Sequence, residues 1–330
     1  KLANLYVREG DYVSARKLLE NSKQKATSQK SSQLLAAILN DLGGLDVTEG
    51  DFVNAKAKFT QSLQIARENS LADQEIKVLL NLAAVEILRK EDAASLPYSN
   101  KAWQRISQLG SKQDRINYSI LLSEILVNSL STHQKTRKSQ VMLAYDILVS
   151  TKAELATFNS KHDSSLVQGL LAELYHATGN INEVEKLFVR AIFLAQESSS
   201  EELLYRWHWQ LARYQRTSGQ ISKAVASYRQ ARVSYQKLNP LFTWTNLNPV
   251  REDDTPSKFH FEFADLLLES SKTLENKSAL NRVLKETRDI IEELKSNELQ
   301  DYFKDSCVAR TRQKLQKVPS SLNKLTAILY

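Results

Sequence analysis

The sequence predicts an all-α fold in which about seven helical hairpins repeat along the chain. Apolar residues recur at every third or fourth position over most of the 330 residues, which is the spacing of one face of an α-helix. Glycines mark two pairs of equivalent turns, Gly10 with Gly50 and Gly179 with Gly219, and the members of each pair are 40 residues apart. Hydrophobic residues make up 42% of the chain and charged residues 25%, so the chain can bury a core.

The clearest copies of the hairpin lie within residues 163–238. In the first copy the first helix ends before Gly179, and the face of the second helix that packs inward carries Val184, Leu187, Phe188 and Ala191. In the second copy the first helix ends before Gly219, and the matching places hold Ala224, Tyr228 and Ala231. A small residue on the first helix lets the second helix approach, while the aromatic residue fills the space under the next hairpin. Glycine supplies the left-handed turn between the two helices.

This spacing of small, aromatic and glycine positions resembles the tetratricopeptide repeat. The copies here are longer than that family's usual length of about 34 residues. The resemblance implies a helical-hairpin solenoid that winds as a right-handed superhelix. Its first helices would line a concave groove in which a protein or peptide partner binds.

The other hairpins follow from the same periodicity. The chain begins inside the hairpin that turns at Gly10, and in the next copy Gly43 on the first helix faces Phe59 on the second. The third hairpin has no glycine at its turn, which is predicted at 91–92, and Pro97 is predicted in the first turn of its second helix. Helices are then predicted from periodicity at 112–130, 137–158, 258–271 and 277–296.

Two long connections interrupt the pattern. The basic stretch 131–138 is predicted to be a solvated loop. The stretch 239–256 holds three of the five prolines together with Phe242 and Trp244, and we expect it to brace the neighbouring helices.

The last 75 residues or so resemble the segment that joins tetratricopeptide arrays to a CHAT domain, a caspase-like peptidase module. The run 261–268 is similar to the helix that precedes that module, and 326–330 reads as a strand. The predicted domains are therefore an α-solenoid at 1–296, with the insertion 239–256, and at 297–330 a linker with the first strand of a CHAT domain. The resemblance implies a truncated piece of a bacterial protein whose catalytic residues follow Tyr330.

No catalytic residue, cofactor or metal site is predicted within the chain. Cys307 is the only cysteine, which excludes a disulfide framework and a multi-cysteine metal site. His260 precedes Cys307 by 47 residues, as in caspases, but Cys307 follows a predicted helix rather than a core strand. Phosphate-binding loops, helical metal-ligand pairs and nucleophile elbows are absent.

Charge and hydropathy limit the partners. The net charge is +7, but the basic residues are scattered, so nucleic acid is expected only through a ribonucleoprotein partner. Apolar runs of 18 residues or more are absent, so no membrane contact is predicted and a cytoplasmic location is expected.

The candidate binding residues lie on the helix predicted at 203–218. Its packing stripe comprises His208, Leu211, Ala212 and Gln215, and its other face carries Arg206, Trp209, Arg213 and Arg216. Matching places on earlier first helices hold Asn40 and Asn81. Arginine pairs with carboxylates, tryptophan offers an apolar platform, and asparagine can hold a peptide backbone. The alternative is solvated arginines beside a tryptophan that lies against the next repeat.

These features predict a protein-interaction scaffold that recognises a partner and regulates or positions the attached caspase-like peptidase. Two alternatives stay open. One is a regulatory subunit that binds RNA or a ribonucleoprotein, which the net charge favours. The other is a cysteine hydrolase that uses Cys307.

Overall fold

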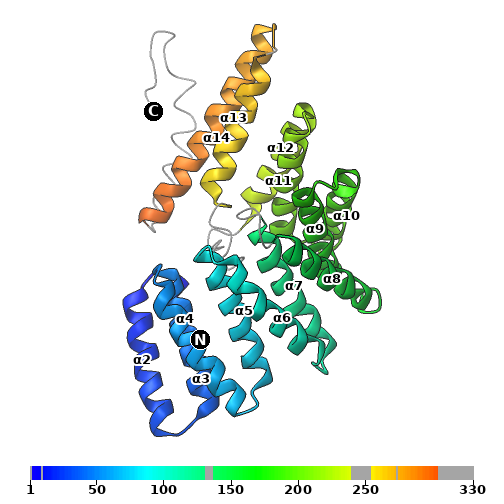
Figure 1. Ribbon diagram of the computed structural model, residues 1–330. Helices are drawn as coiled ribbons and strands as arrows, with labels where there is room; N and C mark the ends of the chain where they lie inside the picture. The colour runs from blue at the N-terminus through cyan, green and yellow to red at the C-terminus, as the bar shows by residue number, and fades with distance from the viewer. Residues whose placement is uncertain (1, 9, 131–136, 239–253, 273, 304–330) are drawn as a thin grey trace. The chain divides into compact units, whose positions relative to one another are not determined.

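The computed structural model describes residues 2–8, 10–130, 137–238, 254–272 and 274–303 (Figure 1). This part of the chain holds fourteen α-helices and no strand, which confirms the predicted all-α fold. The first seven helices are α1 (Leu2–Arg8), α2 (Tyr12–Ser28), α3 (Ser32–Thr48), α4 (Phe52–Glu68), α5 (Ala72–Leu88), α6 (Asp92–Ser107) and α7 (Lys112–Ser129). The others are α8 (Arg137–Leu155), α9 (Lys161–Thr178), α10 (Val184–Glu197), α11 (Glu201–Thr217), α12 (Ile221–Lys237), α13 (Pro256–Ser271) and α14 (Lys277–Phe303).

The chain divides into two units. Unit 1 is formed from Lys1–Tyr214 and Gln230–Glu252, and unit 2 from Gln215–Arg229 and Asp253–Tyr330. Within unit 1, each odd-numbered helix from α3 to α9 is the first helix of a hairpin and packs against the following second helix. A short 3-10 helix, Ile181–Glu183, precedes α10.

Left-handed residues make the turns inside the hairpins. The predicted glycines have positive φ, with values of 76° at Gly10, 79° at Gly50, 79° at Gly179 and 74° at Gly219. In the third hairpin this conformation falls on Lys90, with φ 62°, just before the predicted turn at 91–92. A side chain in this region clashes with its own backbone, so Lys90 costs about 1 kcal/mol relative to glycine. The turn has kept its 40-residue spacing from Gly50 although the glycine is missing.

Glycines inside two helices allow close packing of aromatic rings. A β-carbon at Gly43 would lie 2.6 Å from Cε1 of Phe59, which confirms the predicted pairing of a small with an aromatic residue. A β-carbon at Gly169 on α9 would lie only 2.3 Å from Cζ2 of Trp207. Both separations are shorter than carbon atoms tolerate, so only glycine fits at these positions.

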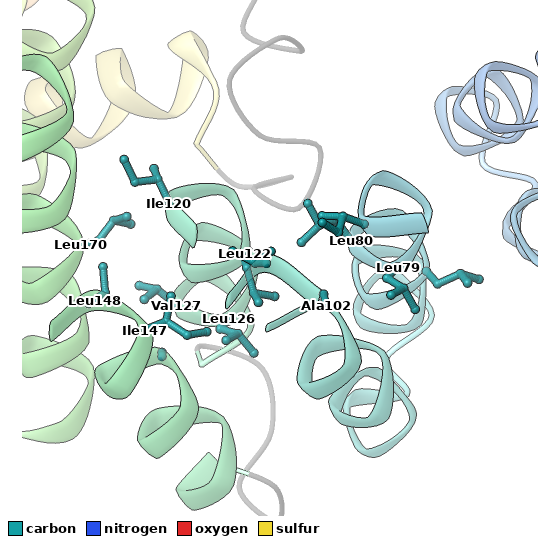
Figure 2. Close-up of a cluster of buried hydrophobic side chains, with 14 of the residues drawn as sticks. Leu79, Leu80, Ala102, Ile120, Leu122, Leu126, Val127, Ile147, Leu148 and Leu170 are labelled. Atoms are coloured by element: carbon teal, nitrogen blue, oxygen red, sulfur yellow. The ribbon is translucent and has the colours of Figure 1, made fainter. Parts of the chain in front are cut away.

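The largest apolar cluster of unit 1 extends through successive hairpins from α4 to α9. Figure 2 shows part of this cluster, with side chains from α5 to α9 labelled, namely Leu79, Leu80, Ala102, Ile120, Leu122, Leu126, Val127, Ile147, Leu148 and Leu170. Each hairpin buries its apolar face against the next one, which is how a repeat array obtains a continuous core.

Two predicted details were wrong. Pro97 lies well inside α6, because that helix begins at Asp92 directly after the Lys90 turn. Proline there removes the bond to the carbonyl of Ala93, but both residues are exposed, so water can serve that carbonyl. In addition, α14 continues to Phe303, past its predicted end at residue 296.

Unit 2 is built around α13 and α14, which pack together. Thr255 caps α13 by accepting the backbone N–H of Lys258 at 3.2 Å, and Pro256 occupies the first turn. Pro256 therefore begins a helix rather than ending the predicted bracing loop. The rings of Tyr228 and Phe263 stack with their centroids 5.2 Å apart.

Several sequence predictions fall outside the described residues. These concern the loop at 131–136, the stretch 239–253, Cys307 and the predicted strand 326–330. Among the described helices, none combines the length and apolar character that crossing a membrane requires.

Candidate binding surface on the first helices

The first helices of unit 1 contact one another directly: α3 packs on α5, α5 on α7, and α7 on α9. Their side chains therefore form one continuous surface. We call it the first-helix face and include in it the part of α11 up to Tyr214, since Arg206 of that helix contacts α7 and α9.

Asn40 and Asn81 meet on this face. Asn81 Nδ2 donates to Asn40 Oδ1 at 2.8 Å, and both side chains are half-buried. The structure thus brings together two of the predicted residues from successive first helices. The bond leaves the Asn81 carbonyl oxygen and a second N–H of Asn81 outside it.

Arg206 belongs to a buried ion cluster. Its Nη1 lies 2.5 Å from Glu124 Oε1 on α7, and its Nη2 lies 3.5 Å from Glu173 Oε2 on α9. The Arg206 side chain is 12% exposed and each glutamate 9%. The prediction that Arg206 is left over from packing was wrong, because its partners come from two earlier repeats.

Trp209 is buried, with 1% of its surface exposed. Its ring lies 5.6 Å from that of Tyr205, and the Arg213 guanidinium carbon lies 4.1 Å from the Trp209 ring centroid. The prediction that Trp209 forms an open apolar platform was therefore wrong. Tyr205 in turn packs 5.4 Å from Tyr235, so the aromatic side chains of α11 bury surface on more than one side of the helix.

Arg213 remains half-buried above Trp209, an arrangement that attracts a cation to the face of the ring. Arg216 lies in unit 2, where its Nη2 is 2.5 Å from Asp265 Oδ2 and 2.8 Å from Glu269 Oε2. Hydrogen bonding to Asp265 raises the pKa of the Arg216 guanidinium. The four predicted residues of this helix therefore do not form a single free stripe.

The predicted packing stripe is confirmed by the burial of Leu211, Ala212 and Gln215. His208 lies beside them, and burial lowers the pKa of its imidazole to about 4. Its Nδ1 is buried without a hydrogen-bond partner. His208 is thus a neutral packing residue at ordinary pH, as the sequence indicated.

Sequence reasoning missed two features. Trp207 Nε1 donates to Ser165 Oγ at 3.0 Å, directly beside Gly169, so that serine and glycine one turn apart on α9 make a slot for the indole. A glycine in the middle of a predicted helix was the available signal. On the first-helix face, the Tyr118 hydroxyl donates to Asp73, which also pairs with Lys77 at 2.7 Å.

No family model and no curated protein sequence matches the chain. Solved structures do resemble it. BtubC from P. vanneervenii superposes with a TM-score of 0.52 at 11% identity, over 73% of this chain and 91% of that one. The chain has a tetratricopeptide-like fold.

Two further structures agree with it. A Rap protein complexed with competence and sporulation factor gives a TM-score of 0.51 at 15% identity, over 88% of this chain and 82% of that one. A signal-transduction ATPase with a tetratricopeptide repeat sensor, from Pyrococcus horikoshii, gives 0.51 at 12% identity, over 96% of this chain and 48% of that one. At these identities the likeness concerns the fold alone.

Proposed function

We propose that this chain is a non-catalytic scaffold that binds an extended segment of a partner protein on the first-helix face. The observation that carries the proposal is the hydrogen bond between Asn40 and Asn81, which aligns amide groups from successive repeats on a half-open surface. An extended peptide offers an N–H and a carbonyl at every residue, and amide side chains complement both. The likeness to a Rap protein complexed with competence and sporulation factor supports the same reading.

In this proposal the arginines select acidic residues of the partner. Arg213 presents its guanidinium over Trp209, so Trp209 positions the cation instead of touching the ligand. Arg206 and Arg216 already pair with carboxylates, and an acidic ligand would have to compete with those partners. We therefore place the first contacts at Asn40, Asn81 and Arg213.

Selection from a displayed library of random peptides tests the proposal. Peptides enriched on the wild-type chain should bind the double variant Asn40→Ala, Asn81→Ala at least about fivefold more weakly, since an interface residue of this kind contributes roughly 1 kcal/mol or more. Asn21→Ala, an exposed position on α2, is the matched control and should bind like the wild type. Equal affinity of the double variant and the wild type would remove the asparagines from the binding site.

We also propose that the array regulates or positions a caspase-like peptidase joined to it in the intact protein. The support is the resemblance of the last 75 residues or so to the segment that precedes a CHAT domain. In that case Cys307→Ala in the intact protein leaves peptidase activity unchanged. Loss of activity without loss of helicity would instead favour the hydrolase alternative.

The net charge of +7 keeps RNA binding as the competing function. That function predicts retardation of RNA in a gel at low salt, with an affinity that falls steeply as salt rises. Retardation that survives the double asparagine variant unchanged would favour RNA over a peptide.

A further inference from the structure

A cavity of about 100 Å³ lies between α6, α7 and α8 of unit 1. At about 30 Å³ for each water in the liquid, this volume holds roughly three water-sized groups. Its walls combine apolar and polar side chains, and the polar ones are unusual in what they offer.

An ion pair forms one side of the cavity. Arg115 Nε donates to Glu154 Oε1 at 3.0 Å, and Arg115 Nη1 donates to the backbone carbonyls of Leu109 at 2.6 Å and Gly110 at 3.3 Å. The second oxygen of Glu154, Oε2, is buried, and no group in the described chain donates to it. An ionised carboxylate oxygen without a donor is costly away from water, so this atom favours a ligand that brings one.

The hydroxyl groups in the wall strengthen this demand. Ser107 Oγ donates its proton to the carbonyl of Gln104 at 2.8 Å, and Thr151 Oγ1 donates to the carbonyl of Ile147 at 2.7 Å. A hydroxyl has one proton, so both oxygens offer only lone pairs to the cavity. Glu154, Ser107 and Thr151 together make the cavity rich in acceptors.

The remaining wall suits a short hydrocarbon stem. Trp103, Ile106 and Ile116 line the cavity with apolar surface. A tryptophan ring also attracts a cation at its face. Among common biological groups, a primary ammonium on a methylene chain matches these walls, since it has three donors, no acceptor and a positive charge.

We propose that this cavity binds the end of an alkylammonium, with Glu154 Oε2 as its charged acceptor and Ser107 and Thr151 as further acceptors. The Arg115–Glu154 pair is neutral as a whole, so binding depends on the directed acceptors more than on net charge. The ammonium can come from a lysine side chain of a partner or from a free amine, which differ only in what lies outside the cavity.

Propylammonium is the probe, and the indole N–H signal of Trp103 in NMR is the readout. The chain has four tryptophans, so Trp103→Phe identifies the signal by its loss. We expect a saturable shift with a dissociation constant in the millimolar range, as suits a ligand of about four heavy atoms. Propanol, which has the same shape without the charge, and sodium chloride at equal ionic strength should give no saturable shift.

Variants locate the site. Glu154→Gln keeps an acceptor for Arg115 and should weaken propylammonium binding at least about tenfold, since a charged hydrogen bond is roughly twice as strong as a neutral one. Thr151→Val preserves shape and charge, should also weaken binding, and decides the matter if Glu154→Gln does not fold. Glu68→Gln, exposed on α4, is the control and should bind like the wild type.

The source of the ammonium is distinguished by Nα-acetyl-lysine methylamide. Affinity equal to that of propylammonium supports a lysine side chain, while binding of propylammonium alone supports a free amine. The proposal is overturned if no saturable shift occurs, if propanol binds equally well, or if the folded Glu154 and Thr151 variants both bind like the wild type.

Discussion

Lys56 Nζ lies 2.6 Å from Glu86 Oε1, and this ion pair repeats, 40 residues along the chain, the pair Arg16–Asp46 with its atoms 2.8 Å apart. In both cases a cation on a second helix reaches forward to an acid on the first helix of the next hairpin. The two acids are almost completely buried, with side chains 1% and 3% exposed. The repeat therefore encodes a periodic ionic link between consecutive hairpins in addition to its apolar contacts.

We expect Glu86→Gln to lower the free energy of unfolding by about 1–2 kcal/mol, because it takes the partner of Lys56 and Arg89 out of a buried position. Lys56 is itself 37% exposed, so solvent screening limits its coupling to Glu86 to about 0.5–1 kcal/mol. Urea unfolding of the cycle Lys56→Met, Glu86→Gln, followed by circular dichroism, measures that coupling. The exposed pair Lys186–Glu183 is the control and should show almost none; equal coupling in both cycles would contradict the prediction.

The features that the sequence predicted well are those determined within one hairpin. Gly50 must be left-handed because the chain reverses there between two amphipathic helices, and the printed residues are enough to see it. The contact of Gly43 with Phe59 joins residues of the same hairpin, so its spacing is nearly fixed by the helix period. Lys90 shows the limit: the turn was predicted near the right place, but its left-handed residue could not be named without a glycine.

The candidate binding site was predicted less well because its contacts join different repeats. Arg206 pairs with Glu124, which precedes it by 82 residues, and nothing in the local pattern indicates that partner. The helical period alone gave Trp209 the same face as Arg206, although the tryptophan is covered by neighbouring aromatic rings. Asn40 and Asn81 were predicted as separate contacts, and their direct hydrogen bond became visible only in the fold.

Gly169→Ala should destabilise the chain by about 1–3 kcal/mol, since the new β-carbon would overlap the buried Trp207 ring. Gly44→Ala is the matched control, because a β-carbon there meets nothing within 4 Å. It should stabilise the chain by about 0.5–1 kcal/mol, the ordinary gain of alanine over glycine inside a helix. Urea midpoints of the two variants would have to move in the same direction to refute this reading.

The stability of the fold should fall in mild acid because of His208. Its pKa is lowered from 6.5 to about 4 by burial, so the unfolded chain binds a proton that the folded chain refuses. The stabilisation is complete above about pH 6.5 and is lost as the pH falls towards 4. His208→Leu should flatten the pH dependence in this window, as measured by urea midpoints between those values.

His162 serves as the contrast of opposite sign. Hydrogen bonding to Asp163, and then to Glu202, raises the pKa of His162 from 6.5 to about 9. Its stabilisation is therefore complete below about pH 6.5 and is lost as the pH rises towards 9. His162→Gln should change the alkaline side of the profile and leave the acid side alone. A profile altered by both variants on the same side would contradict one of the two assignments.

The last prediction separates the structural role of Trp209 from the binding role of Arg213. Trp209→Ala should lower stability by about 3–5 kcal/mol, as truncation of a buried tryptophan does, so a loss of binding in that variant reports unfolding. Arg213→Gln keeps the tryptophan in place and should change stability by about 1 kcal/mol or less, the size of a cation–π contact at a partly exposed site.

If Arg213 receives an acidic residue of the partner, Arg213→Gln should weaken binding of the selected peptides about threefold to fivefold at low salt. Arg213→Lys should retain part of that affinity, because it keeps the charge but loses the planar fork that fits a carboxylate. The difference between wild type and Arg213→Gln should shrink as salt rises, since screening weakens exposed charge pairs. Calorimetry at two salt concentrations measures both effects on variants of confirmed helicity. Equal affinities in all three proteins would leave recognition to Asn40 and Asn81, because these amides need no charge to hold a peptide backbone.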